Sequence, residues 1–208
     1  MRFSLILCAA LLGWACQSAD TFRGTVMPDT PISDFALTDH HEQPFNLSAY
    51  RGNVVVLFFG FTFCPDVCPL TLSTWKRVHD ALQADTAKVK FVYVTVDPER
   101  DTPQKLKTHL AIFSPQFLGL TGSPEALREV YAEFGVYAEK ETIAAGASGY
   151  LVNHTTRMFV VDQNGVLRLL ISHDAPVADI VHDLRLLLHA KPHLPILPLA
   201  LRRFGQGR

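Results

Sequence analysis

The middle of the chain alternates between two kinds of hydrophobic pattern. Continuous runs of β-branched and aromatic residues at 53–59 and 89–96 are typical of central strands that are buried on both faces. Each run is followed by a segment in which apolar residues recur at helical spacing, which predicts helices at 69–84 and 103–113. Strand and helix therefore alternate, as they do in α/β domains.

The second half of the chain adds elements of both kinds. They are predicted as a short strand, a helix, a brief edge strand, a hairpin and a last helix at 117–120, 123–134, 136–138, 158–171 and 176–188. Asp162, Asn164 and Gly165 supply the turn of the hairpin. This order of elements predicts a thioredoxin-like α/β fold, a three-layer sandwich around a central mixed sheet with an inserted strand and helix plus the hairpin.

The N-terminal segment indicates export. Arg2 precedes an uncharged apolar run at 3–15, which has the length of a signal-peptide core and is short for a membrane-spanning helix. The segment 13–16, Gly-Trp-Ala-Cys, resembles the bacterial lipobox, so 1–15 is predicted as a leader and Cys16 as the lipidated residue. An uncleaved N-terminal anchor and a cleaved soluble form are the alternatives. We therefore expect the protein at the periplasmic face of a bacterial membrane.

The rest of the chain is predicted to form a tether, one domain and a tail. The polar, Pro-punctuated stretch 16–30 is expected to be a flexible tether, 31–190 the folded domain, and 191–208 a tail of unknown structure. With 208 residues, 48% of them hydrophobic, the chain is long enough for one well-packed domain. Its formal net charge of -1 gives no indication of a nucleic-acid partner.

The predicted domain contains a single pair of cysteines. Cys8 lies in the leader and Cys16 is assigned to lipid, which leaves Cys64 and Cys68. One pair is too few for a disulfide scaffold, so it is predicted to be a functional site. It lies between a predicted strand and the following helix, where the helix N-terminus lowers the pKa of a thiol.

The spacing of the pair allows two chemical states. If both cysteines lie on the first helical turn, Cys64 and Cys68 share one face, so they can form a disulfide or bind one metal ion. Two thiolates suit Cu(I) or Zn(II), and a structural zinc site would need four protein ligands. A third ligand must therefore come from elsewhere in the chain.

Four segments resemble the Sco/SenC family, copper proteins of cytochrome c oxidase assembly. The most specific is 60–69, Gly-Phe-Thr-Phe-Cys-Pro-Asp-Val-Cys-Pro. Segments 95–103 and 117–122 are similar to the second and third blocks of the family, and 150–155 to the block whose histidine is a copper ligand. The resemblance covers roughly residues 31–188.

The resemblance implies a copper site and a partner. Cu(I) or Cu(II) would be held by Cys64, Cys68 and His154, with the copper delivered to the binuclear CuA centre of cytochrome c oxidase subunit II. Phe61 and Phe63 would limit water near the metal. Three ligands leave the copper exchangeable, as a metallochaperone requires.

Further residues around the proposed ligands are candidates for supporting roles. Asp66 and Asp97 are predicted to tune the site or contact the partner, although an aspartate before proline is also ordinary turn chemistry. The family commonly has Asp and Ser where this chain has Asn153 and Thr155. These departures concern the surroundings of His154 and not the histidine itself.

Thiol chemistry is the competing function. The Cys64/Cys68 pair, which can form a redox-active disulfide, would as a dithiol reduce the CuA cysteines or another periplasmic copper chaperone, and whether this makes the protein an enzyme stays open. Three residues rather than two separate the cysteines, which favours metal binding. The structural alternatives are a structural disulfide and, for His154, a hydrogen-bonding loop residue.

Overall fold

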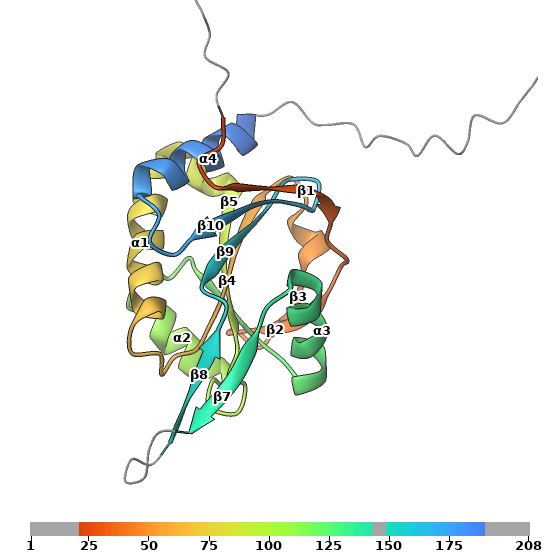
Figure 1. Cartoon of the computed structure of the whole chain (residues 1–208), viewed down its shortest axis with the longest axis vertical. Coiled ribbons are helices and arrows are strands. Elements are labelled where there is room, and N and C mark those ends of the chain that lie inside the picture. The colour runs from red at the N-terminus through yellow and green to blue at the C-terminus, as the bar shows by residue number, and fades with distance from the viewer. Residues whose placement is uncertain (1–20, 143–148, 190–208) are drawn as a thin grey trace, which may run out of the picture.

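The computed structural model describes residues 21–142 and 149–189 (Figure 1). Its strands are β1 (Thr25–Pro31), β2 (Ala36–Asp39), β3 (Pro44–Asn46), β4 (Val54–Gly60), β5 (Val89–Thr95), β6 (Leu118–Thr121), β7 (Ala138–Thr142), β8 (Tyr150–His154), β9 (Arg157–Val161) and β10 (Val166–Ser172). Its helices are η1 (Leu47–Tyr50), α1 (Val67–Leu82), η2 (Gln83–Lys88), α2 (Pro103–Ala111), α3 (Pro124–Phe134) and α4 (Val177–His189).

The strands form one mixed sheet and a separate ribbon. The sheet has eight strands in the order β1-β10-β9-β4-β5-β6-β2-β3, and β7 pairs with β8 alone. Strands β4, β5 and β6 are parallel because helical crossovers connect them, whereas β9 and β10 form the predicted antiparallel hairpin. The thioredoxin-like α/β prediction is therefore confirmed.

Helices cover the sheet on both faces, which gives three layers. Figure 1 shows α1 and α4 on one side of the sheet and α3 on the other. Successive side chains of β4 point to opposite faces of the sheet. Phe58 packs edge-on against Trp75 of α1, whereas Phe59 packs against Phe134 of α3. All seven residues of β4 are buried, as its continuous apolar pattern predicted.

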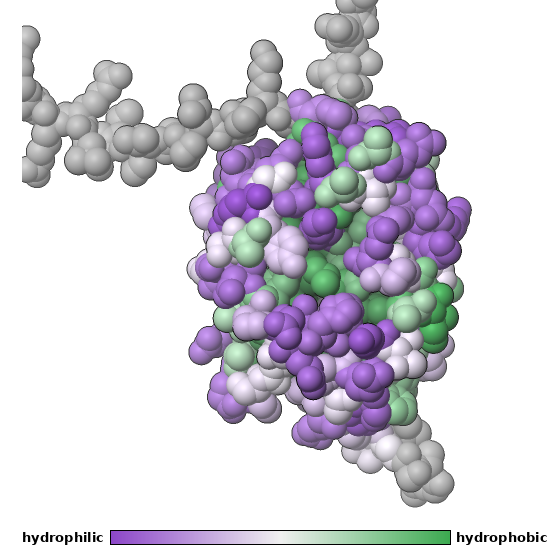
Figure 2. Space-filling view, turned by 180° about the vertical axis from the view of Figure 1, so that it is seen from behind, coloured by the Kyte–Doolittle hydropathy of each residue, from purple (hydrophilic) through white to green (hydrophobic). Residues whose placement is uncertain are grey.

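The face of the molecule opposite to the view in Figure 1 is mainly polar (Figure 2). Figure 2 shows hydrophilic residues over most of this face, with apolar residues gathered mainly near its centre. Among the described residues, no helix is both long and apolar enough to cross a membrane. The predicted leader 1–15, the lipidation site Cys16 and the tail 191–208 lie outside the described residues.

The predicted tether from 16 to 30 was wrong from Thr25 onward. Residues Thr25–Pro31 form β1, an edge strand that pairs antiparallel with β10. The amides of Arg23 and Gly24 also donate to the Asp183 carboxylate of α4. Six of the seven β1 side chains are exposed, so this strand is held by backbone pairing and has no hydrophobic pattern to reveal it. The folded domain thus begins before residue 31.

The brief edge strand predicted at 136–138 is also placed differently. Strand β7 begins at Ala138 and extends to Thr142, and it pairs with β8 instead of joining the main sheet. This matters for the site, because β8 ends at His154. In Figure 1 the ribbon projects from the end of the sheet that carries the β4–α1 connection.

Candidate metal centre

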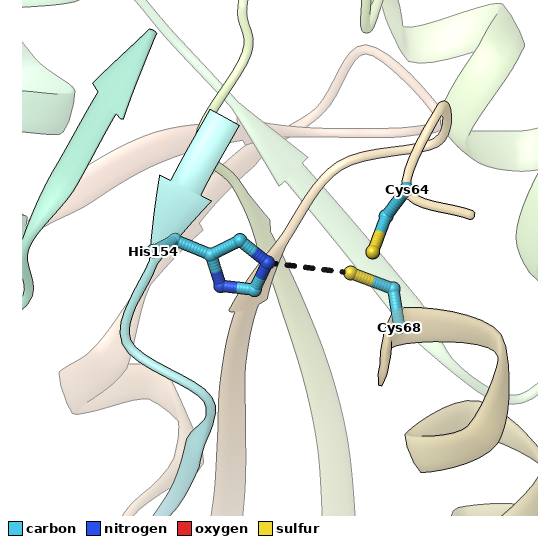
Figure 3. A group of neighbouring side chains, drawn as sticks. All are labelled: Cys64, Cys68 and His154. Carbon is cyan, nitrogen blue, oxygen red and sulfur yellow. Dashed lines mark hydrogen bonds between the residues drawn. The ribbon is translucent and has the colours of Figure 1, made fainter. Parts of the chain in front are cut away.

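Three elements bring the predicted ligands together at the carboxyl end of β4. Cys64 lies in the loop after β4, Cys68 is the second residue of α1, and His154 is the last residue of β8. Their sulfur and imidazole nitrogen atoms all lie within 4.8 Å of one another. Figure 3 shows the imidazole pointing toward the two sulfurs. Among the described residues this is the single cluster of three or more such donors.

The hydrogen bonds of His154 prepare one ring nitrogen to bind a metal. Its Nδ1 lies 3.0 Å from the carbonyl oxygen of Thr155, and its Nε2 lies 3.6 Å from the Cys68 sulfur. A carbonyl can only accept, so Nδ1 carries a proton and Nε2 is the ring nitrogen that faces the sulfurs. Phe58 and Phe61 fix the ring plane by edge-on contacts, with ring centroids 6.0 and 5.8 Å away.

The two thiols are unequal. A hydrogen bond from Cys68 lowers the pKa of Cys64 to about 4, with smaller contributions from His154 and from the amides of Asp66 and Cys68 at the start of α1. Burial raises the pKa of Cys68, which is fully buried. In the metal-free dithiol, Cys64 is therefore a half-buried thiolate and Cys68 holds the proton. Both are free cysteines here.

A buried carboxylate fixes the loop that precedes Cys64. Asp101 accepts hydrogen bonds from the amide and hydroxyl of Thr62, at 3.0 and 2.6 Å, and from the hydroxyl of Thr95 at 2.8 Å. Its side chain is fully buried, so each of these donors satisfies an oxygen that water cannot reach. The next residue, Thr102, caps helix α2, because its side chain accepts a hydrogen bond from the Lys105 amide.

A second polar network attaches the β8 ribbon to the body of the fold. Arg100 donates to the Tyr150 carbonyl oxygen at 3.0 Å, and its guanidinium lies 3.7 Å from the centroid of the Tyr150 ring. Both Arg100 and the Tyr150 hydroxyl donate to the buried Asp97 carboxylate. These contacts hold β8, and therefore His154 at its end, against the loop after β5.

The family assignment follows from a match over almost the whole described fold. A family model described as SCO1/SenC matches residues 25–189. This chain belongs to the SCO1/SenC family. The boundaries of the match agree with the structure, in which β1 begins at Thr25 and α4 ends at His189.

Relatives and solved structures of SCO1/SenC proteins agree with this assignment. A putative copper-binding protein of Stutzerimonas stutzeri is 40% identical over 138 residues, which are 66% of this chain and 67% of that protein. The SCO2-like protein RC0895 of Rickettsia conorii is 34% identical, and 64% of its own length is matched. The chain thus covers about two thirds of these relatives.

Solved structures extend the agreement to three dimensions. Apo Sco1 from Thermus thermophilus is 44% identical, with a TM-score of 0.72 over 81% of this chain and 98% of that one. ScoI from Bradyrhizobium japonicum, solved with copper bound, is 32% identical, with a TM-score of 0.70 over 76% of this chain and 99% of that one. These similarities support the SCO1/SenC fold throughout the described residues.

The two predicted supporting aspartates have different places around the SCO1/SenC site. Asp97 belongs to the Arg100 network and is not among the clustered donor atoms. Asp66 is exposed and its side chain caps no helix amide, so it acts on Cys64 through its backbone N–H alone. Arg100 and Tyr150 were not predicted, because their contacts join segments 50 residues apart.

The aromatic residues beside the cysteines also differ in position. Phe61 is buried against His154, so it shields this side of the site from water. Phe63 is 51% exposed and lies beside Arg100 and Lys105, so the expectation that it limits water near the sulfurs is not supported by its position. Asn153 donates to Glu141 on the neighbouring strand and faces away from the cluster.

A close approach at Gly60 makes this glycine part of the site. A Cβ at Gly60 would lie 2.5 Å from the Tyr93 hydroxyl and 2.8 Å from the Cys68 sulfur. Both distances are too short for any side-chain carbon, and neither group can swing into solvent because both residues are buried. Only glycine lets the sulfur and the hydroxyl lie over this end of β4.

We expect Gly60→Ala to lower the free energy of unfolding by about 1–3 kcal/mol, because the added methyl group overpacks the core. It should also displace the Cys68 sulfur and disturb the site. Urea unfolding of the metal-free protein measures the first effect. Gly122→Ala is the matched control, since its Cβ would meet the end of the Leu37 side chain, away from the cysteines. Equal stability of wild type and Gly60→Ala would contradict the close approach.

Proposed function

We propose that this chain binds copper through Cys64, Cys68 and His154 and delivers it during cytochrome c oxidase assembly. Proteins of the SCO1/SenC family bind copper and are linked to the assembly of that oxidase. The observation that carries the proposal is the convergence of two sulfurs and a correctly oriented imidazole nitrogen within 4.8 Å. Two soft thiolates and one imidazole suit Cu(I), and no fourth donor completes a structural zinc site among the described residues.

The arrangement supports transfer as well as binding. The three protein ligands leave room for an incoming ligand, so copper can pass from one protein to another without becoming a free ion. Cys64 is half-buried in a loop, whereas Cys68 is fully buried on α1, so we expect the partner to approach from the Cys64 side. The receiving site we propose is the CuA centre of oxidase subunit II, with delivery at the periplasmic face of a bacterial membrane and lipid anchoring at Cys16.

A Cu(I) titration of the purified, reduced full-length protein under anaerobic conditions tests the copper proposal. In competition with a chelator, wild type should bind one equivalent, and His154→Ala should weaken the affinity by at least about tenfold because a ligand is lost. His182→Ala is the matched control, because this helix α4 histidine contacts the Thr21 carbonyl oxygen, far from the cysteines in sequence. Weak binding that His154→Ala leaves unchanged would contradict the proposal.

A second function, thiol-disulfide exchange, is favoured by the inequality of the thiols. The Cys64 thiolate would attack a disulfide of the CuA site or of another periplasmic copper chaperone, forming a mixed disulfide and releasing one partner thiolate. Cys68 would then lose its proton and attack Cys64, which releases the second thiolate and leaves a Cys64–Cys68 disulfide. The two electrons pass from this pair to the partner. This reaction does not require His154, so His154→Ala separates the two functions.

A further inference from the structure

Tyr93 is a buried polar group for which neither copper binding nor thiol exchange, as proposed above, has a use. It lies on β5 with its side chain fully buried, on the sheet face that also carries Phe58, whose ring centroid is 6.1 Å away. Its hydroxyl makes no hydrogen bond of regular geometry among the described residues, and the Cys68 sulfur lies close enough for a weak interaction with it. A buried hydroxyl without a regular hydrogen bond is unfavourable by comparison with phenylalanine in the same place, so its presence calls for an explanation.

The position of the hydroxyl supplies that explanation. The Tyr93 oxygen and the Cys68 sulfur both lie over the Cα of Gly60, where each would be within 3 Å of a Cβ on that residue. The hydroxyl therefore lies near the Cys68 sulfur in the buried part of the metal centre. No other buried side-chain oxygen of the described residues lacks a regular hydrogen bond.

The chemical state of Cys68 decides how strong an acceptor the hydroxyl has. A neutral thiol or a disulfide sulfur is a weak acceptor, whereas a thiolate sulfur carries negative charge and accepts a stronger hydrogen bond. Coordination to copper removes the thiol proton of Cys68. The weak contact of Tyr93 with Cys68 thus becomes a stronger hydrogen bond when the metal binds.

We propose that Tyr93 is a positioning residue that donates a hydrogen bond to the Cys68 sulfur in the copper-bound state. The inference rests on the proposed copper site. The hydrogen bond favours the copper-bound dithiolate over the metal-free and disulfide forms, and it orients a sulfur lone pair. It also withdraws electron density from the sulfur, because a hydrogen bond to a ligand tunes the metal behind it.

Tyr93→Phe tests this inference, since it removes only the hydroxyl. The full-length variant should bind Cu(I) about tenfold more weakly, which is the usual size of a lost supporting contact around a metal ligand. The free energy of unfolding of the metal-free variant should be unchanged or higher, because a hydroxyl without a regular hydrogen bond is removed. In the Cu(II)-loaded variant, the sulfur-to-copper charge-transfer band should move to lower energy.

Tyr131→Phe is the matched control. The Tyr131 hydroxyl donates to the Thr95 carbonyl oxygen at 2.6 Å, so its removal should lower the stability of the metal-free protein and leave the copper affinity unchanged. The two variants are thus expected to show opposite patterns. A loss of stability in metal-free Tyr93→Phe with wild-type copper affinity would make Tyr93 a structural core residue and overturn the inference.

The titration of wild type separates this inference from the proposed function. If wild type binds no Cu(I), the copper function and the role of Tyr93 are both overturned. If wild type binds tightly, His154→Ala weakens the binding and Tyr93→Phe does not, the copper function stands and only the role of Tyr93 is overturned.

Discussion

In the reduced, metal-free protein at pH 5, Cys64 is expected to attack a small disulfide reagent about fiftyfold faster than a cysteine of the unfolded chain. The pKa of Cys64 is lowered from 9.0 to about 4, chiefly by the hydrogen bond from Cys68. At pH 5 the thiolate of Cys64 is therefore about ten-thousandfold more populated than that of a cysteine in the unfolded chain. A less basic sulfur is also a weaker nucleophile, which lowers the rate of attack by roughly two hundredfold.

The pH dependence of that reaction follows from the direction of the shift. A lowered pKa means that the thiolate is present above the pKa and is lost as the pH falls through about 4. The initial rate with 4,4'-dithiodipyridine, followed from pH 3 to 9, measures it. With Cys8 and Cys16 replaced by serine in both proteins, Cys64→Ser leaves only the buried Cys68 and should react more slowly than the unfolded chain. A rate that rises only through pH 8–9 would show that Cys64 is an ordinary thiol.

Arg100→Ala should lower the free energy of unfolding by about 3 kcal/mol, because it leaves the buried Asp97 carboxylate without its charged partner. The substitution also removes the donor to the Tyr150 carbonyl oxygen and the cation that lies against its ring. The β8 ribbon should therefore open more often, and hydrogen exchange at its amides should become faster. His154 would be held less firmly, and Cu(I) affinity should fall about tenfold.

Arg128→Ala is the matched control for Arg100→Ala. Arg128 pairs with Glu125 on α3, and both side chains are largely exposed, so this change should alter stability by less than about 1 kcal/mol. Denaturant unfolding of both variants, with hydrogen exchange resolved for β8, measures the difference. If the two substitutions have equal effects, the Asp97–Arg100–Tyr150 network does not hold the ribbon.

The central strands, the helices and the cysteine site could be predicted because their signals are local. The apolar runs of β4 and β5 and the helical spacing of α1 and α2 are visible within short windows. The position of Cys64 and Cys68 between a strand and a helix followed from the same windows. The likeness of residues 150–155 to a family block identified His154. Strand β1 was missed because an exposed edge strand has no burial pattern.

Only the tertiary structure decided how these residues act together. Cys68 and His154 lie 86 positions apart in the chain, and Thr62 and Asp101 lie 39 apart, so their contacts depend on how the strands are ordered in the sheet. The difference between the two thiols comes from burial and from hydrogen bonds across these separations. The sequence by itself determined the fold class, the cysteine pair and the candidate histidine. The packing of distant segments determined which sulfur is ionised, which imidazole nitrogen faces the two sulfurs, and which polar groups surround them.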